Sequence, residues 1–288
     1  MRRQTRTVAA MLGAALGFFA RPGYPSALDT QGFWQHVFDV LEAFPPNYVA
    51  SADSGTVWQS GYCGNVTVVR CWPAASLPFI VIAAGFPADQ PPPEDGLAWA
   101  VLGPWTWRPP SLPDAASYCL RWRALWMAQV LRAAESTVGQ PVKAVILAEG
   151  LDAPPALAVA AFHPDRVEGV VLVNPRPWQH LNRGKVALEG AEGRALAAVL
   201  ARHPDWAAAL GEALRPYDIA ELAPLVGCPV VVVASLWRPE PWLLSAAEEF
   251  GWALVDSGRR NPPLAELVRS KVFDVLWPEA LGFIRGGL

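Results

Sequence analysis

The sequence predicts an α/β protein, a three-layer sandwich with a mostly parallel central sheet and a short helical cap. Two observations carry this prediction. Three short apolar runs, AVILA at 144–148, GVVLV at 169–173 and PVVVVAS at 229–235, lack the polar alternation of a half-exposed strand, as is typical of parallel strands buried on both faces. Helical patterns separate these runs, and this order implies right-handed crossovers between neighbouring parallel strands.

Two further strands and a long helix are predicted before these runs. Apolar stretches at 77–85 and 97–103 flank the proline-rich segment FPADQPPPEDG at 86–96. We interpret this segment as an excursion between two strands of one sheet, and not as a linker between domains. In the following segment, 118–139, apolar residues recur at helical spacing and Gly139 can end the helix.

The bulk composition fits one large domain with a single core. The chain has 288 residues, of which 52% are hydrophobic and 17% charged, and no internal repeat or linker divides it. We expect one domain over residues 28–288 with a helical cap inserted at about 176–220. Within the cap, Pro204 should split GRALAAVLARHPDWAAALGEALRPY into two short helices, because proline breaks a helix interior.

The first 27 residues form a segment of their own. They carry four arginines and no acidic residue, and their apolar run from Val8 to Ala20 is 13 residues long. Such a run is too short to span a bilayer and about right for the core of a signal peptide. Residues 1–27 therefore favour export, for example to the periplasm. An organelle (mitochondrial) transit peptide, or a plain N-terminal helix of a cytoplasmic protein, stays open. Membrane association is expected only through this segment.

Charge and cysteine spacing exclude several kinds of site. The formal net charge is -3, with 23 basic and 26 acidic residues and no basic stripe, so nucleic-acid binding is not expected. No CxxC or His/Cys spacing points to a metal or another cofactor. As ends of an extended strand, Cys63 and Cys71 would lie about 26 Å apart at roughly 3.3 Å per residue, far beyond the roughly 7 Å limit for a disulfide. We expect four packed thiols unless the chain turns there.

From about residue 60 to 287 the sequence resembles the α/β-hydrolase superfamily. IVIAAGFP is similar to the strand that ends in HGFP there, with Ala84 in place of the His. AVILAEGLDA and AAFHPDRVEGVVLVNPRP resemble the nucleophile elbow, its helix and the next strand, and IAELAPLVGCPVVVVAS resembles the run into the strand that delivers the acid. The resemblance implies an oxyanion hole formed by the backbone of Phe86 and Leu151.

Three catalytic positions of that family are substituted in this chain. The family's mechanism needs a nucleophile on a strained strand-to-helix turn, a His that relays the proton, and an acid that orients the His. Aligning AEGLD with GxSxG puts Gly150 at the nucleophile position, and the acid and His positions fall on Arg238 and Arg259. The resemblance therefore implies a hydrolase site without its catalytic groups.

A second alignment would restore a nucleophile. Shifted by two residues, GLDAPP matches the elbow of family members that use Asp. Asp152 would then be the attacking group, and His180, at the start of the cap, would be the sole plausible base. His163 follows Gly150 by 13 residues and Asp152 by 11. The longer spacing is typical of the family, which favours the Gly150 alignment.

Arginines near the vacated positions indicate an environment that favours anions. Arg238, Arg259 and the adjacent Arg260 would meet the start of the helix after Gly150, whose N–H groups also favour anions. Either an internal acid closes salt bridges with these arginines, or a carboxylate or phosphate ligand binds there. The candidate internal acids are Glu149, Asp152, Glu240 and Asp256.

The sequence thus predicts a non-catalytic protein that resembles an α/β-hydrolase and acts as a binding, accessory or structural subunit. Its partner would be another protein or an anionic or apolar small ligand. The alternative is a hydrolase of esters, epoxides or haloalkanes with Asp152 as its nucleophile.

Overall fold

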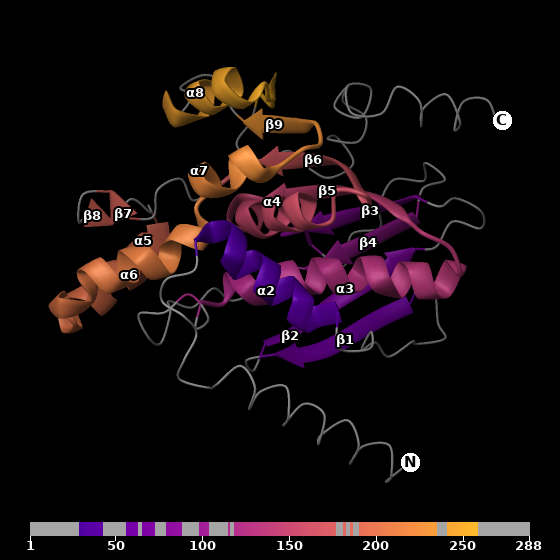
Figure 1. Ribbon diagram of the computed structural model, residues 1–288, viewed down its shortest axis with the longest axis horizontal. Helices are drawn as coiled ribbons and strands as arrows, with labels where there is room; N and C mark the ends of the chain where they lie inside the picture. The colour runs from indigo at the N-terminus through magenta and orange to yellow at the C-terminus, as the bar shows by residue number, and fades with distance from the viewer. Residues whose placement is uncertain are drawn as a thin grey trace, which may run out of the picture.

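The structure is a computed structural model, shown in Figure 1. The predicted segment 1–27 lies outside the part of the chain that it describes, so export stays a prediction. The described residues are 29–42, 56–62, 65–72, 79–87, 98–103, 115, 118–176, 181–182, 185–186, 190–234 and 241–258.

An eight-stranded sheet forms the centre of the fold, with the strand order β1-β2-β4-β3-β5-β6-β9-β10. Neighbouring strands from β4 to β10 are parallel, whereas β1 and β2 form an antiparallel pair and β2 joins β4 in antiparallel fashion. The predicted mostly parallel sheet is therefore confirmed. The strands are β1 Thr56–Tyr62, β2 Asn65–Trp72, β3 Phe79–Ala84, β4 Ala98–Leu102, β5 Lys143–Glu149, β6 Val167–Val173, β9 Val230–Ala234 and β10 Ala253–Asp256.

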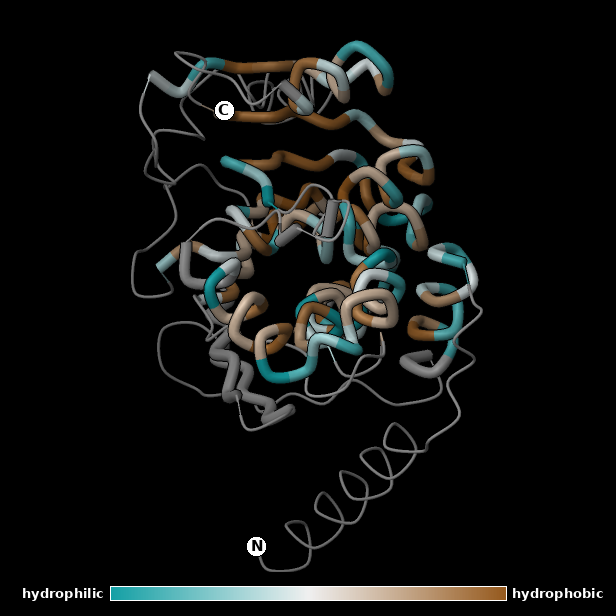
Figure 2. Tube along the Cα trace, turned by 90° about the vertical axis from the view of Figure 1, so that its left-hand side faces the viewer, coloured by the Kyte–Doolittle hydropathy of each residue, from teal (hydrophilic) through white to brown (hydrophobic). Residues whose placement is uncertain are grey.

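The three apolar runs that predict buried strands form β5, β6 and β9, which lie side by side. Their interior residues are buried, and Figure 2 shows the strands as hydrophobic along most of their length. β3 and β4 are parallel neighbours. The proline-rich segment between them therefore connects two strands of one sheet, as predicted.

Helices cover one face of the sheet in Figure 1. Their apolar side chains share one core with alternate residues of the strands, whereas the other alternate residues form a second buried cluster on the opposite face. Both faces of the sheet are thus buried, and the predicted α/β class is confirmed. Helices that contribute to the first core are α2 Thr30–Glu42, α3 Leu120–Val138, α4 Ala153–Phe162, α7 Ile219–Leu222 and α8 Pro241–Phe250, and the cap adds Leu196, Leu210 and Leu214.

The long helix predicted at 118–139 is α3. It ends where predicted, because Gly139 adopts a left-handed conformation with φ of 74° and its N–H donates to the Glu135 carbonyl. A side chain at this φ would clash with its own backbone, so glycine is the favoured residue. The helix is buried along most of its length, and both α2 and α4 pack against it.

The cap has the helix break that Pro204 predicts. α5 Gly190–Arg202 ends before the proline, a short 3-10 helix η3 spans Pro204–Trp206, and α6 Ala207–Leu214 follows. A small antiparallel pair, β7 Leu181–Asn182 and β8 Lys185–Val186, precedes α5. The break is expected because proline lacks the N–H that would continue the helix.

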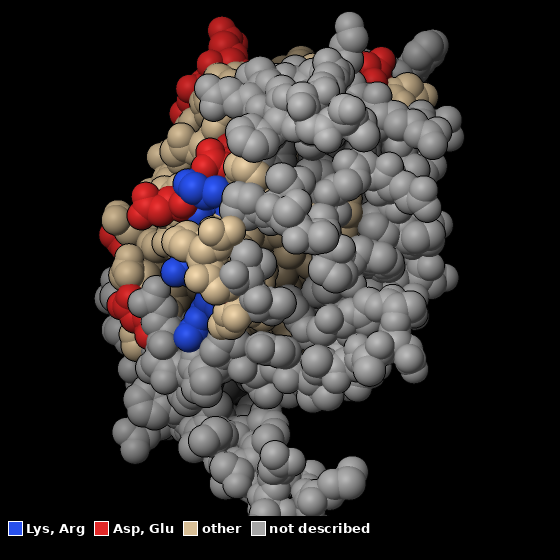
Figure 3. All heavy atoms as spheres, turned by 90° about the vertical axis from the view of Figure 1, so that its right-hand side faces the viewer, with Lys and Arg blue, Asp and Glu red and all other residues tan. Residues whose placement is uncertain are grey.

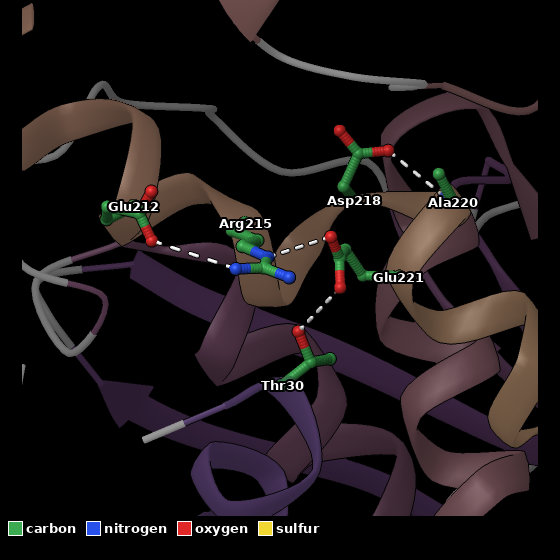
Figure 4. A network of polar contacts seen from close by, with 6 residues as sticks. All are labelled: Thr30, Glu212, Arg215, Asp218, Ala220 and Glu221. Atoms are coloured by element: carbon green, nitrogen blue, oxygen red, sulfur yellow. Dashed lines mark hydrogen bonds and ion pairs between the residues drawn. The ribbon is translucent and has the colours of Figure 1, made fainter. Parts of the chain in front are cut away.

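Polar contacts join the cap to α2 at the 3-10 helix η4 Arg215–Tyr217 (Figure 4). Arg215 donates to Glu221 at 2.8 Å, and Thr30 on α2 donates to the same carboxylate at 3.5 Å. The buried Trp34 indole donates to the Pro216 carbonyl at 2.7 Å. The cap is therefore attached to the body through the start of α2.

The described surface carries charges of both signs. Acidic and basic side chains lie beside one another on the face shown in Figure 3, and the exposed pair Lys143–Glu168 is 2.7 Å apart. Cys119 and Cys228 are free thiols; Cys71 lies in β2, and Cys63 is outside the described residues. Among the described residues, no cluster of His, Cys, Asp or Glu could hold a metal ion, and no helix could span a membrane.

Candidate functional site: an elbow without a nucleophile

The chain makes a sharp turn where β5 meets α4. Glu149, the last residue of β5, is extended with φ of -100° and ψ of 133°. Gly150 follows with φ of +58°, and the 3-10 helix η2 Gly150–Asp152 leads into α4. A non-glycine residue at this φ costs roughly 1–2 kcal/mol. Gly150 therefore lies at the apex of the strand-to-helix turn, and Asp152 lies two residues inside the helical segment.

The guanidinium of Arg176 lies against the apex. A Cβ atom added to Gly150 would be 3.3 Å from Arg176 Nη2 and 3.7 Å from its Nε. The backbone supports this arrangement, since the Arg176 N–H donates to the Gly150 carbonyl at 2.9 Å. The arginine thus occupies the space into which a side chain at position 150 would begin to project.

Sequence reasoning missed Arg176 as a site residue and used it only as the start of the cap. The position of Arg176 in the sequence could have indicated this role. Arg176 follows β6, the neighbour of β5, and ligand sites of such sheets lie beyond the carboxyl ends of the strands.

Asp152 forms a buried salt bridge with Arg123 of α3. The two bonds join Nε to Oδ1 at 2.6 Å and Nη2 to Oδ2 at 2.8 Å, and each side chain is only 2% exposed. Such a two-pronged pair is the strong form of a charge-assisted hydrogen bond. Arg123 Nη2 also donates to the Gly103 carbonyl, just beyond β4, at 3.3 Å. The pair therefore joins α3, the elbow and the end of β4.

Arg123 is the second residue that sequence reasoning missed. It lies in LRWRALWMAQV with Leu120 and Met127 on its own helical face, and both of these are fully buried. A charged side chain among buried neighbours needs a partner. That pattern could have directed attention to a buried acid such as Asp152.

The turn after β3 packs directly against the elbow. Gly85 has φ of +90°, and an added Cβ would be 3.0 Å from Asp152 Oδ2 and 3.2 Å from the Glu149 carbonyl oxygen. Phe86, which follows, is buried. Within the described part of the chain, neither the Phe86 N–H nor the Leu151 N–H has an acceptor, since the first N–H groups of a helix have none within it. Two backbone donors beside the elbow thus have no acceptor among the residues that the structure describes.

Burial and a neighbouring charge act together on Glu149. Burial raises the pKa of its carboxyl, the Asp152 carboxylate raises it further, and the Arg176 guanidinium lowers it. Glu149 is half-buried. Among the described residues, the elbow thus brings together the acids Glu149 and Asp152 and the arginines Arg123 and Arg176, and the pKa of Glu149 is raised.

Other predicted site residues are placed as follows. Arg238, Arg259, Arg260, His180 and Glu240 lie outside the described residues. Asp256 accepts a hydrogen bond from the Gly258 N–H. Pro154 and Pro155 are buried at the start of α4 and have no N–H, so this helix start offers fewer donors to an anion than the prediction assumed.

Two of the described histidines pack against aromatic rings. His163 caps the end of α4 opposite the elbow and meets the Phe38 ring edge-on at 4.9 Å. His203 stacks on Trp206 in the cap, with ring centroids 4.1 Å apart. His36 is exposed on α2.

Replacing Gly150 by Ala should destabilise the fold by about 2–3 kcal/mol, of which roughly 1–2 kcal/mol is the backbone cost and the rest is displacement of Arg176. Gly139→Ala is the matched control, because its φ is +74° and an added Cβ would meet nothing within 4 Å. Urea unfolding measures both variants. In an Arg176→Ala background the two costs should become equal; equal costs already in the wild-type background would show that Arg176 yields freely.

Known proteins share this architecture. No family model matches the sequence, and no curated protein sequence matches it closely enough to be a relative. Among solved structures, the chain is similar to an acetyl xylan esterase from Paenibacillus sp. R4, with a TM-score of 0.61 and 14% identity over 89% of this chain and 97% of that one.

A second esterase supports the same conclusion. Acetyl xylan esterase 1 from Thermoanaerobacterium sp. JW/SL YS485 is similar with a TM-score of 0.57 and 15% identity, over 89% of this chain and 92% of that one. Identities this low concern the fold, because unrelated functions share folds. By its strand order, its elbow and these structural relatives, the chain has the α/β-hydrolase fold.

Proposed function

We propose that this α/β-hydrolase-fold protein is non-catalytic and acts by binding, as an accessory or structural subunit or as a carrier of a small ligand. One observation carries the proposal. The apex of the elbow is Gly150, and the Arg176 guanidinium lies 3.3 Å from the position at which a nucleophile's side chain would start.

The environment of Asp152 argues against the alternative of an Asp nucleophile. Both carboxylate oxygens accept hydrogen bonds from Arg123, and the side chain is 2% exposed. A nucleophile has to reach the substrate and be activated for attack. An acid that is buried and held by both oxygens meets neither condition.

The fold does not decide whether the protein is an enzyme; the residues of the site do. The two structural relatives are esterases, but the same fold can carry different functions, and the chemistry depends on the residues of the site. In the Gly150 alignment, arginines also take the acid and His positions, at Arg238 and Arg259. These substitutions support binding over hydrolysis.

The test is turnover of short-chain esters, epoxides and haloalkanes by the purified full chain. We expect no turnover above buffer for the wild type. Asp152→Asn is measured beside it, with Glu168→Gln as a control that removes a carboxylate from the exposed Lys143–Glu168 pair. Circular dichroism confirms that each variant is folded at the assay temperature.

Any turnover by the wild type would contradict the proposal, and the variants would say how. Loss by several orders of magnitude in folded Asp152→Asn alone would make the protein an Asp-nucleophile hydrolase. Turnover that survives in both variants would indicate a different nucleophile.

A further inference from the structure

We propose that acid releases part of α2 from the rest of the fold. When His163 at the end of α4 takes up a proton, the second half of α2, around Phe38, leaves α4, whereas the first half stays bound to the cap. Helix α2 is then a pH-sensitive switch. The inference does not depend on whether the protein is catalytic.

The first half of α2 is bound to the cap by directional contacts. The Trp34 indole donates to the Pro216 carbonyl at 2.7 Å, and this bond is buried. The rings of Phe33 and Trp34 meet the Tyr217 ring edge-on, with centroids 5.5 and 5.3 Å apart. None of these groups titrates between neutral pH and pH 4, so acid leaves this end of the helix in place.

The second half of α2 meets α4 through the ring of Phe38, which is 3% exposed. The centroid of this ring lies 5.7 Å from that of Phe162 and 4.9 Å from that of His163, which it meets edge-on. These ring contacts involve no hydrogen bond like that of Trp34. Because one of the two partners on α4 is a histidine, this end of the helix can respond to pH.

The backbone of His163 is fixed, so α2 is the partner that can move. The His163 N–H donates to the Val159 carbonyl at 2.9 Å, and its carbonyl accepts from the N–H groups of Arg166 and Val167 at 3.0 Å each. Its Nε2 is buried and has no hydrogen-bond partner within the part of the chain that the structure describes. In the protonated ring both nitrogens carry a hydrogen, so Nε2 becomes a buried donor without an acceptor. Departure of the neighbouring Phe38 ring admits water to it.

The charges around His163 also oppose a proton on its ring. Burial lowers the pKa of His163 to about 4, and the positive charges of Arg166 and of Arg132 on α3 contribute to this shift. α4 itself carries no charged residue that could compensate for them. The closed arrangement therefore favours the neutral ring.

The acids around the end of α4 are either paired or exposed. None of them is among the causes of the pKa shift of His163. Glu135 of α3 pairs with Arg166 at 3.3 Å, and Glu168 of β6 pairs with Lys143 at 2.7 Å. The exposed titratable groups are Asp165 in the turn after His163, and His36 and Asp39 of α2.

The two forms of α2 differ in their affinity for the proton. In the open form His163 has the ordinary pKa of a histidine, about 6.5, whereas in the closed form its pKa is about 4. Above pH 6.5 the ring is neutral in both forms, and pH has no effect on the opening. As the pH falls from about 6.5 to about 4, the ratio of open to closed molecules rises by up to about tenfold per pH unit. Between pH 7 and pH 5 the rise should be roughly twentyfold.

The experiment is amide hydrogen exchange of the full chain at about pH 7 and about pH 5, on either side of the onset of this effect. Mass spectrometry compares peptides from α2 with peptides from the central strands β5 and β6. Labelling times are scaled so that an unprotected amide exchanges to the same extent at both pH values. We expect the protection of the second half of α2 to fall roughly twentyfold at the lower pH.

Local opening is distinguished from unfolding of the whole chain by two further readings. The second half of α2 should be less protected than β5 and β6 at both pH values, because it opens without them. A low concentration of urea should accelerate exchange in the strands and leave the second half of α2 unchanged, since a local opening exposes little surface.

Three variants test the roles of the two rings. In His163→Gln the protection of α2 should no longer depend on pH. In Phe38→Leu, which removes the ring beside His163 but keeps an apolar side chain, α2 should exchange faster at pH 7 and show a smaller pH dependence. His36→Gln, at an exposed position of the same helix, should keep the wild-type behaviour.

Contrary results would overturn the proposal in different ways. Unchanged protection of α2 at the lower pH would show that the His163 ring accepts its proton without release of the helix. Equal protection of α2 and the central strands, with equal dependence on urea, would show that α2 opens only when the whole chain unfolds. The wild-type pH dependence in His163→Gln would assign the opening to another group.

Discussion

Replacing Arg123 by Met is expected to destabilise the folded protein by about 3–5 kcal/mol, because it leaves the Asp152 carboxylate buried without its partner. Both side chains are 2% exposed, and the two hydrogen bonds between them are 2.6 and 2.8 Å long. Urea unfolding of the wild type and the variant at neutral pH measures the loss. Asp152→Leu should cost a similar amount, since it removes the buried carboxylate that accepts two hydrogen bonds from Arg123.

The matched control is Lys143→Met. Lys143 and Glu168 form a pair of similar length, 2.7 Å, but their side chains are 39% and 41% exposed. Water compensates for the loss of such a pair, so the expected change is below about 1 kcal/mol. The contrast between the two variants measures what burial adds to the cost of an unpaired charge.

The double variant Arg123→Met with Asp152→Leu tests the reason for the loss. Apolar residues can replace a buried ion pair with little or no loss of stability, so the double variant should be more stable than either single variant. If the two single losses simply add in the double variant, packing and not unpaired charge would explain them. A single variant as stable as the wild type would contradict burial of the pair.

A second large effect is expected from His163 when the pH falls. Burial, together with the charges of Arg166 and Arg132, lowers the pKa of His163 from 6.5 to about 4. The folded state therefore binds the proton less readily than the unfolded state. This contribution to stability is complete above pH 6.5 and is lost as the pH falls from about 6.5 to about 4.

The difference between these pKa values corresponds to roughly 3 kcal/mol. Comparison of urea unfolding at pH 7 and at about pH 4.5, near the lower end of this window, should show a larger loss for the wild type than for His163→Gln. Loss of the ring contact with Phe38 will lower the stability of the variant at both pH values, so the pH-dependent difference is the quantity to compare. The same pH-dependent loss in both proteins would contradict the assignment.

His36→Gln is the control, because it removes a histidine that lies on the surface. His36 is exposed on α2, the helix that also carries Phe38. A substitution at an exposed position away from the core should change stability at pH 7 by less than about 0.5 kcal/mol.

Much of the fold was predictable because its signals are local. Buried parallel strands need continuous apolar runs, and β5, β6 and β9 have them. The end of α3 at Gly139 and the helix break at Pro204 follow from backbone geometry of single residues. The spacing of 13 residues between Gly150 and His163, at the end of α4, likewise favoured one position for the turn.

The charged groups at the elbow were much less predictable. Sequence reasoning singled out Arg238, Arg259 and Arg260, which lie outside the described residues, and overlooked Arg123 and Arg176. α3 looks from its sequence like a helix with one face against the sheet. In the structure the helix is buried along most of its length, and Arg123 is enclosed against Asp152 and the Gly103 carbonyl where a surface arginine would otherwise be expected.

The sequence by itself determined the strands β3, β4, β5, β6 and β9, the end of α3, the helix break at Pro204, and that glycine occupies the turn after β5. Only the tertiary structure decided which charges meet there. Arg123 and Asp152 are 29 residues apart in the chain, and Arg176 reaches the apex from the next strand. Local periodicity depends on neighbours along the chain, whereas the partner of a buried charge depends on how helices and strand ends are positioned in space.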